Sequence, residues 1–596
     1  MQLSVPQRST PADNAFDSKP ASVREWINNL PMANIGETAR MLFEALNELN
    51  RQHIPAQQRF NALEQLAKPV EFVNDNLKKH FVGRTLPLAE RNLRIAHLSR
   101  EISSALATGY KILVVEESGR GRRRDRKLLL ASIQRAIKGL TAVLVKAYQA
   151  YAPCPPATWQ EIHALYRYAE EHSLSRSKVV GDRSRAPSTI EDAYKQILLL
   201  ALACPYRLRA NEVESILEVL EDWAPHARLE PFGDDSEALF VVDLGQDQPP
   251  GYRALRNDDD RHEDCRLLCT RTLSEHLRQA LSRRRESPSG AVGRIPSRTL
   301  RQLMLAWGVM PRRRFSRVSD HSQVVVAMGL SSIHYFVSGE VAFNGASIGA
   351  ECGTDLGAGL IDNRARYQAR NLDTAEEQVP NVLEMNYRIE GEAPPSETEI
   401  KVARSATGMG VRIDPSHKTQ QWKMVNVSAG GYRLLWDNSD STRAQVGELV
   451  GIREQSDPDT FHWQLGVIRW MKYSEKRGLE LGVQMLSPGA VAVAAWQDRP
   501  RVADKDYTRG LLLPEIASIQ QRATLLLPSP PFRAGDTAIA NCHGKDVRVK
   551  LTRLVENTGS FAQFQFTPLG EVSRRRAPGR TTKATSSDFD DIWDLL

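Results

Sequence analysis

The sequence predicts a multidomain α + β protein, with an all-α N-terminal part followed by two β-rich parts. Three observations support this class. First, apolar residues recur with a helical period between Trp26 and Trp223. Second, the stretch Trp422–Trp436 reads as two short strands joined by a polar, glycine-containing turn. Third, short strands alternate with Pro and Gly turns after residue 505. With 596 residues, 41% of them hydrophobic, the chain is long enough for about three to five domains with their own cores.

The composition indicates a cytoplasmic protein without a membrane span. The 79 Lys and Arg residues exceed the 72 Asp and Glu residues only slightly, so the net charge of +7 fits nucleotide or nucleic-acid binding without arguing for either. The six cysteines follow no framework, the N-terminus lacks the basic and apolar regions of a signal peptide, and no run approaches 18 apolar residues. Neither a nucleophile elbow, a P-loop, an HExxH motif nor a kinase set appears, which predicts that the protein is not an enzyme.

The N-terminal third is expected to be helical. Residues 1–21 are rich in Ser, Pro, Ala and Asp and predict a disordered or extended N-terminus, and residues 22–225 are expected to form the helical domain. Its later helices are predicted at Ala89–Tyr110, Lys127–Tyr151, Thr158–His172, Ile190–Leu202 and Ala210–Trp223. A faint tetratricopeptide pattern is present without a regular 34-residue period, so both a helical bundle and a tetratricopeptide-like domain stay open. Either is a platform for protein interactions.

Residues 226–310 read as a mixed α/β connector. We expect a strand at Ala238–Asp243 and helices at Leu267–Arg283 and Arg298–Trp307. On one helix, His262, Cys265, Cys269 and His276 would lie near one face, but metal sites usually recruit ligands from separate elements. No metal site is therefore predicted.

The turn inside Trp422–Trp436 has the chemistry of a ligand site. Asn426 and Ser428 can hydrogen-bond a ligand or nearby backbone, while Gly430 and Gly431 permit a positive φ and a close approach of a ligand to the main chain. An ordinary hairpin with unusual turn residues is the alternative that these residues alone leave open.

The pattern Asn426-x-Ser428-x-x-Gly431 resembles the (D/N)xSxxG signature of PilZ domains, small β-barrels that bind cyclic di-GMP. Three later apolar segments resemble the following strands of that barrel: Gly447–Val450, Trp463–Trp470 and Gly478–Gln484. The resemblance implies a PilZ-like antiparallel β-barrel over residues 311–490, with cyclic di-GMP as its ligand.

The second PilZ motif is RxxxR before the first strand, and Arg313 and Arg317 supply it ahead of the apolar segment Val324–Met328. Guanidinium groups pair bidentately with phosphate and with the guanine edge, so two arginines suit a cyclic dinucleotide. Arg317 and Asn426 are 109 positions apart, which departs from the family spacing and predicts an insertion at about 345–415 that leaves the barrel and returns. The predicted ligand-binding residues are Arg313, Arg317, Asn426, Ser428 and Gly431.

The C-terminal region divides into a second small β-domain at about 505–570 and a flexible linker with an acidic, aromatic tail at 571–596. In a helical tail, four apolar residues occupy positions i, i+3, i+4 and i+7 and form one stripe: Phe589, Ile592, Trp593 and Leu596. Such a stripe fits a groove on a protein partner or on the N-terminal helices. Packing of the tail on its own β-domain is the alternative.

Together these features predict a cytoplasmic bacterial cyclic di-GMP receptor that relays ligand binding to an unidentified protein partner through the helical domain or the tail. The alternative is an interaction scaffold whose PilZ-like barrel does not bind the dinucleotide. A basic RNA- or DNA-binding protein is less favoured, because no RRM, KH or helix-turn-helix pattern accompanies the arginine clusters.

Overall fold

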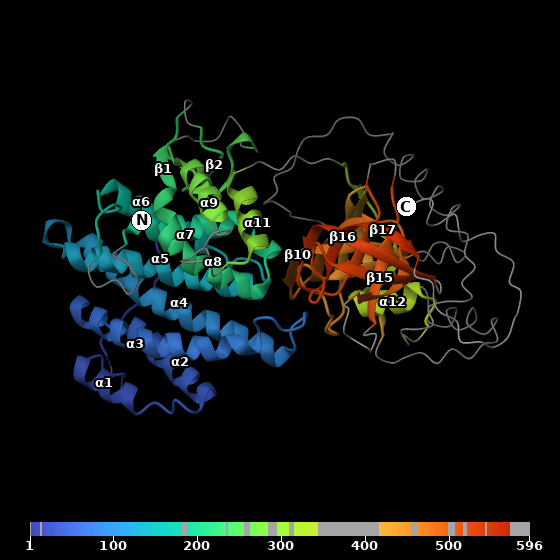
Figure 1. Ribbon diagram of the computed structural model, residues 1–596. Helices are drawn as coiled ribbons and strands as arrows, with labels where there is room; N and C mark the ends of the chain where they lie inside the picture. The colour runs from blue at the N-terminus through green and yellow to red at the C-terminus, as the bar shows by residue number, and fades with distance from the viewer. Residues whose placement is uncertain are drawn as a thin grey trace, which may run out of the picture.

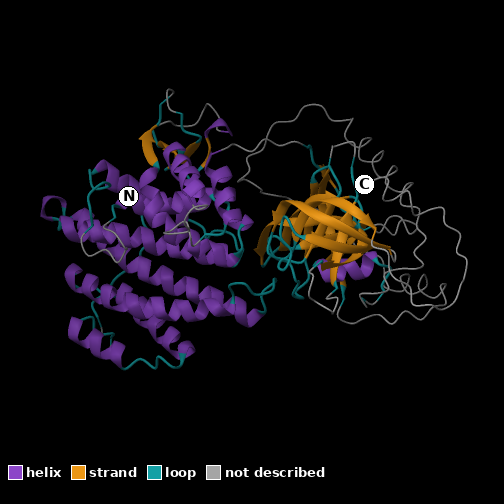
Figure 2. Cartoon of the chain, in the orientation of Figure 1, coloured by secondary structure: helices purple, strands orange, loops and turns teal. Residues whose placement is uncertain are grey.

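A computed structural model shows a helical domain beside two β-barrels, which confirms the predicted multidomain α + β class (Figures 1 and 2). The structure describes residues 2–11, 15–179, 188–233, 237–255, 263–283, 295–308, 315–341, 343, 417–454, 463–498, 507–516, 521–542 and 545–571. The helical domain and the small connector sheet occupy one half of the view, and the two barrels with helix α12 (Leu330–Val337) occupy the other (Figures 1 and 2).

The helical domain is an array of packed α-helices around one large apolar core. Its helices are α1 (Pro20–Asn28), α2 (Ile35–Arg51), α3 (Ala56–Leu77), α4 (Glu90–Gly119), α5 (Arg126–Gln149), α6 (Thr158–Glu171), α7 (Ile190–Leu202) and α8 (Ala210–Trp223). Short 3-10 helices lie at η1 (Lys78–His80), η2 (Gly121–Arg123), η3 (Pro205–Arg207) and η4 (Ala224–His226). The predicted helices are confirmed, and α4 continues past its predicted end to Gly119.

The described residues of the N-terminal segment form no helix before Pro20 and are held against the helical domain, which fits the extended and not the disordered form of the prediction. The Ser9 amide donates to the Arg51 carbonyl at 2.8 Å, and the Ser9 carbonyl accepts from the His53 amide at 2.7 Å. The Phe16 ring packs edge-on against Trp26. A polar composition predicts disorder when a segment buries nothing by itself, whereas here the end of α2 offers backbone partners.

Helix α5 is the central core helix. By length and composition alone it could cross a membrane, but 83% of the relevant window is buried inside the domain. It packs against α4, α6, α7 and α8. Its hydrophobicity on all sides is explained by burial among these neighbours.

The connector forms a four-stranded antiparallel sheet in the order β1–β4–β2–β3, with two helices beside it. Its elements are β1 (Arg228–Pro231), β2 (Phe240–Asp243), β3 (Gly251–Tyr252), η5 (Arg253–Leu255), β4 (Cys265–Cys269), α9 (Arg271–Arg283) and α11 (Ser297–Gly308). The predicted helix Leu267–Arg283 is wrong at its start, because Leu267 and Leu268 lie in β4 between two partner strands. A short apolar run fits a buried strand as well as a helix.

The first β-barrel is built by antiparallel pairing, and the β7–β8 hairpin closes it because β8 also pairs with β11. Its elements are β5 (Val318–Ser319), β6 (Gln323–Met328), α12 (Leu330–Val337), β7 (Thr419–Ser428), β8 (Gly431–Trp436), β9 (Leu449–Glu454), β10 (Gln464–Ser474) and β11 (Gly478–Ser487). Apolar residues such as Val324, Trp422 and Leu434 fill its interior. The PilZ-like barrel expected from the sequence is present, and the predicted insertion at 345–415 lies outside the described residues.

The second β-barrel is closed in the order β12–β13–β14–β17–β16–β15. Its strands are β12 (Val491–Gln497), β13 (Thr508–Leu513), β14 (Thr524–Leu527), β15 (Thr537–Cys542), β16 (Lys545–Asn557) and β17 (Ala562–Glu571). The predicted start at about 505 is too late, since β12 pairs with both β13 and β15 and is needed for closure.

The three domains contact one another directly. Helix α12 lies between the barrels, where Ile333 packs with Leu449 of the first barrel and Leu511 of the second. On the other side, Thr442 of the first barrel donates its amide and its hydroxyl to the Leu86 carbonyl of the helical domain at 2.7 and 2.9 Å. The first barrel is therefore held between the helices and the second barrel.

Candidate functional site

Strand β5 brings the arginine segment against the motif strand β7. Val318 lies opposite Val427 and Ser319 opposite Asn426 in the antiparallel β5–β7 ladder. The Asp320 amide extends the contact by donating to the Val425 carbonyl at 3.2 Å. Residues directly after Arg317 are thus neighbours of the Asn426 motif, despite the long separation in sequence.

The β7–β8 hairpin presents two of the predicted polar residues on the outer face of the barrel. Val427 is buried in the interior, so Asn426 and Ser428, one position to either side, point outward. Both are partly exposed. The register shifts between Met424 and Asn426, and this irregularity sets the outward direction of Asn426.

The glycines of the hairpin allow two close approaches. Gly431 has φ +148°, and a Cβ at this position would lie 2.0 Å from the Val483 carbonyl oxygen of β11. At Gly430, a Cβ would lie 2.9 Å from the ring of Phe315, which comes from the arginine segment. The close approach predicted at these glycines was that of a ligand, whereas the groups that approach in the structure belong to the protein itself: the Val483 carbonyl and the Phe315 ring.

A row of residues in register crosses the outer face beside the hairpin. Ser319 pairs with Asn426, Asn426 with Arg433, Arg433 with Gly482 and Gly482 with Trp470. The indole of Trp470 lies directly over Gly482, since a Cβ there would meet its Nε1 at 1.7 Å. The row places a partly exposed aromatic ring on the same face as Asn426.

Arg433 and Arg469 add guanidinium groups that the sequence analysis did not single out. Arg433 is 2% exposed and bonds Glu480 at 2.6 Å. Arg469 donates Nε to the Gln484 side chain at 2.6 Å, and Gln484 lies opposite Gly431. Both arginines sit inside apolar strand patterns. Arg433 belongs to β8 of the hairpin itself, whereas Arg469 on β10 comes near the hairpin only through the pairing of β10 with β11 and of β11 with β8.

The structure brings Arg317, Asn426, Ser428 and Gly431 to one edge of the barrel, with the Arg317 side chain largely exposed. Arg313 lies outside the described residues, as do the tail residues Phe589, Ile592, Trp593 and Leu596.

The connector residues considered for a metal are spread over separate elements, with Cys265 and Cys269 on β4 and His276 on α9. Within the described ranges, no three His, Cys, Asp or Glu side chains are grouped so that they could hold a metal ion.

Comparison with known proteins covers nearly the whole chain. Family models match residues 21–235, described as the N-terminal domain of the cyclic-di-GMP receptor FimW, residues 239–491, its middle PilZ domain, and residues 493–569, its C-terminal β-barrel domain. The cyclic-di-GMP receptor FimW of Pseudomonas aeruginosa is 31% identical over 612 residues, covering 100% of this chain and 99% of the relative. The chain belongs to the FimW family. This membership confirms the PilZ resemblance, and the FimW models place the PilZ domain in the middle of the chain. No solved structure matches the chain.

Proposed function

We propose that this protein binds cyclic di-GMP on the outer face of the first barrel, at the edge formed by β5, β7 and β8. The observation that carries the proposal is the pairing of Ser319 with Asn426, because it joins the arginine segment to the Asn–Ser–Gly hairpin. Membership in the FimW family supports the same ligand.

The chemistry of this face matches the parts of a cyclic dinucleotide. Arg317, together with Arg313, supplies guanidinium groups for phosphate oxygens or for the O6 and N7 atoms of guanine. Asn426 and Ser428 supply neutral donors and acceptors beside them. Gly431 lets the hairpin lie against the Val483 carbonyl of β11, and the Trp470 indole offers a surface on which a base stacks. These roles involve binding and orientation, with no bond broken.

The protein is proposed to act in the cytoplasm as a receptor that passes ligand binding to a protein partner. The described cysteines are all free thiols, in keeping with a reducing compartment. The helical domain offers a large surface for a partner, and the tail residues 588–596 carry the apolar stripe of a groove-binding helix. A pull-down with the full chain and with a 588–596 deletion tests the tail, since the deletion is expected to lose the partner and to keep the dinucleotide affinity.

Isothermal titration calorimetry with cyclic di-GMP tests the main proposal, with cyclic di-AMP and a short RNA as comparisons. Saturable binding of cyclic di-GMP alone, lost in an Asn426→Ala/Ser428→Ala double variant, is the expected result. Absence of binding in the wild type favours the scaffold alternative. Preferential binding of RNA favours a nucleic-acid function.

A further inference from the structure

Arg469 sits between the proposed ligand face and the second barrel. It lies in the irregular part of β10, where the pairing with β11 shifts between Ile468 and Trp470. Its Nη1 and Nη2 atoms donate to the two carboxylate oxygens of Glu556 at 2.5 and 2.8 Å, and its Nε donates to Gln484. This is the bidentate fork geometry with which a guanidinium also holds a phosphate.

The same guanidinium borders the hairpin. Gln484, its neighbour on β11, lies opposite Gly431, and the adjacent Trp470 covers Gly482. The Arg469 side chain is 31% exposed, so an anion on this face can reach it. A ligand phosphate could therefore reach the Arg469 guanidinium, whose Nη1 and Nη2 atoms are bonded to Glu556 in this structure.

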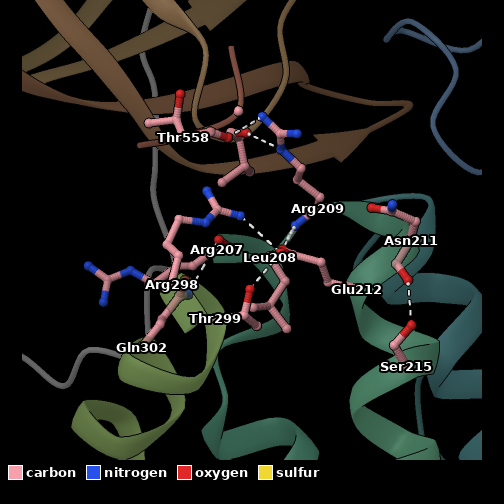
Figure 3. Close-up of polar contacts among 12 residues, drawn as sticks. Arg207, Leu208, Arg209, Asn211, Glu212, Ser215, Arg298, Thr299, Gln302 and Thr558 are labelled. Carbon is pink, nitrogen blue, oxygen red and sulfur yellow. Dashed lines mark hydrogen bonds and ion pairs between the residues drawn. The ribbon is translucent and has the colours of Figure 1, made fainter. Parts of the chain in front are cut away.

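Glu556 belongs to a segment that also touches the helical domain. It lies next to the turn that joins β16 to β17, and two groups of that turn accept from Arg209: the Thr558 carbonyl at 2.7 Å and the Ser560 hydroxyl at 3.3 Å (Figure 3). Arg209 also donates Nε to the Val446 carbonyl of the first barrel at 3.2 Å. One short turn thus contacts both the proposed ligand face and the start of α8.

We propose that a phosphate of the bound dinucleotide replaces the Glu556 carboxylate on Arg469, and that release of Glu556 loosens the β16–β17 turn from Arg209. The inference rests on the proposed function, since it names how that site is regulated. A carboxylate and a phosphodiester each present two oxygens to the same fork, and one guanidinium does not serve both bidentately. Glu556 is then an internal competitor of the ligand.

Competition for Arg469 determines the direction in which ligand binding and the Glu556 contact affect each other. If Glu556 and the phosphate exclude each other on Arg469, removal of the carboxylate tightens ligand binding. By linkage, the ligand must weaken the contact of Glu556 with Arg469 by the same factor. The ligand therefore changes the contact between the second barrel and the helical domain, which is a route from the site to a partner.

The test is titration of the full-length chain with cyclic di-GMP in the wild type and in Glu556→Gln, which keeps the side-chain shape and removes the charge. We expect the Kd to fall about 3- to 10-fold in Glu556→Gln. Asp498→Asn is the control, because Asp498 is another carboxylate of the second barrel and pairs with Arg548 at 3.0 Å, and the Kd of this variant is expected to equal that of the wild type.

Hydrogen exchange of residues 556–561 supplies a second readout. The exchange is expected to rise on ligand addition in the wild type, and to be already raised without ligand in Glu556→Gln. A wild type that binds while Glu556→Gln binds equally or more weakly overturns this inference alone. A wild type that does not bind cyclic di-GMP overturns the proposed function and the inference with it.

Discussion

Ser319 lies directly opposite Asn426 in the β5–β7 ladder, although the two residues are 107 positions apart in the sequence (426 − 319). The pairing brings the two PilZ-like motifs together, because backbone hydrogen bonds hold the segment that follows Arg317 along strand β7. Strands β6 and β7 are likewise paired, although the connection between them is long.

Replacing Arg317 with Ala should weaken cyclic di-GMP binding by at least about tenfold, because a charge-assisted hydrogen bond contributes about 1.5–3 kcal/mol. Arg313→Ala is expected to behave alike. The measurement is calorimetric titration of each variant. Arg477→Ala is the control, since Arg477 is an exposed arginine in the turn at the far end of β10. Wild-type affinity in both motif variants, together with lost binding in Ser428→Ala, would show that the arginine motif lies elsewhere.

Gly431→Val should reduce both binding and stability. Its φ of +148° disfavours an L side chain, and the added Cβ meets the Val483 carbonyl, which belongs to backbone and cannot turn away. We expect the free energy of unfolding of the barrel to drop by about 1–3 kcal/mol or more. Urea unfolding measures it, with Gly489→Val as the control, because a Cβ at Gly489 meets nothing within 4 Å. Equal losses in the two variants would contradict the argument.

Trp470→Ala should weaken binding by about 1–3 kcal/mol, the usual contribution of stacking one base on an aromatic ring. Trp470→Phe is expected to restore part of the affinity, because a smaller ring still covers Gly482. Calorimetry measures both variants. Identical affinities for Ala and Phe would mean that the indole has no stacking role.

The sequence was sufficient for elements whose pattern is local. The helix at Ile190–Leu202 begins with a capping box between Thr189 and Asp192, and the hairpin at Ser428–Gly431 has its turn residues in place, so short-range chemistry set both. Longer-range features were missed. Leu267 joined a strand because two partner strands flank it, and no local signal in the sequence reports their presence.

The candidate site shows the same division. Asn426, Ser428 and Gly431 lie close together in the sequence, so they could be predicted as one motif. Trp470 and Arg469 read as ordinary members of an apolar strand, and they reach the site only because β10, β11 and β8 are consecutive in the closed barrel. Their contribution depends on register, which the sequence of one strand does not contain.

His163 is a buried histidine that should make the helical domain sensitive to acid. Burial lowers its pKa to about 4, against the smaller raising effects of a backbone hydrogen bond to Gln248 and of the charges on Asp243 and Asp247. Its ring nitrogens contact the Tyr194 hydroxyl at 2.7 Å and the Gln248 carbonyl at 2.8 Å. The neutral ring is thus the form that the fold accommodates.

The sign of the pH effect follows from this depressed pKa. Below the ordinary histidine pKa of about 6.5 the unfolded chain binds a proton that the folded domain does not, so stability falls as the pH drops from about 6.5 to about 4. The full effect is about 3 kcal/mol. In His163→Gln, urea unfolding followed by circular dichroism should show a shallower pH dependence over that window. An unchanged slope would assign the acid sensitivity to other groups.

Arg209 should couple the unfolding of the helical domain to the unfolding of the two barrels. Its guanidinium donates to carbonyls of both barrels, and its own amide donates to the Glu212 carboxylate at 2.9 Å, while Glu212 also accepts from Arg298 at 2.9 Å (Figure 3). Arg209→Ala leaves the buried Thr558 region with an unpaired carbonyl, which costs about 1–3 kcal/mol.

In calorimetric melting, Arg209→Ala should therefore separate the melting transition of the second barrel from that of the helical domain. In the wild type the two transitions are expected to lie closer together in temperature. Arg209→Lys should recover little of the coupling, because one ammonium does not reach the Val446 and Thr558 carbonyls in the geometry of a planar guanidinium. The control is Arg94→Ala, which removes an exposed arginine paired within α4 to Glu90 at 3.2 Å. A melting profile of Arg209→Ala that matches both the control and the wild type would mean that the apolar contacts between the domains couple them without the Arg209 hydrogen bonds.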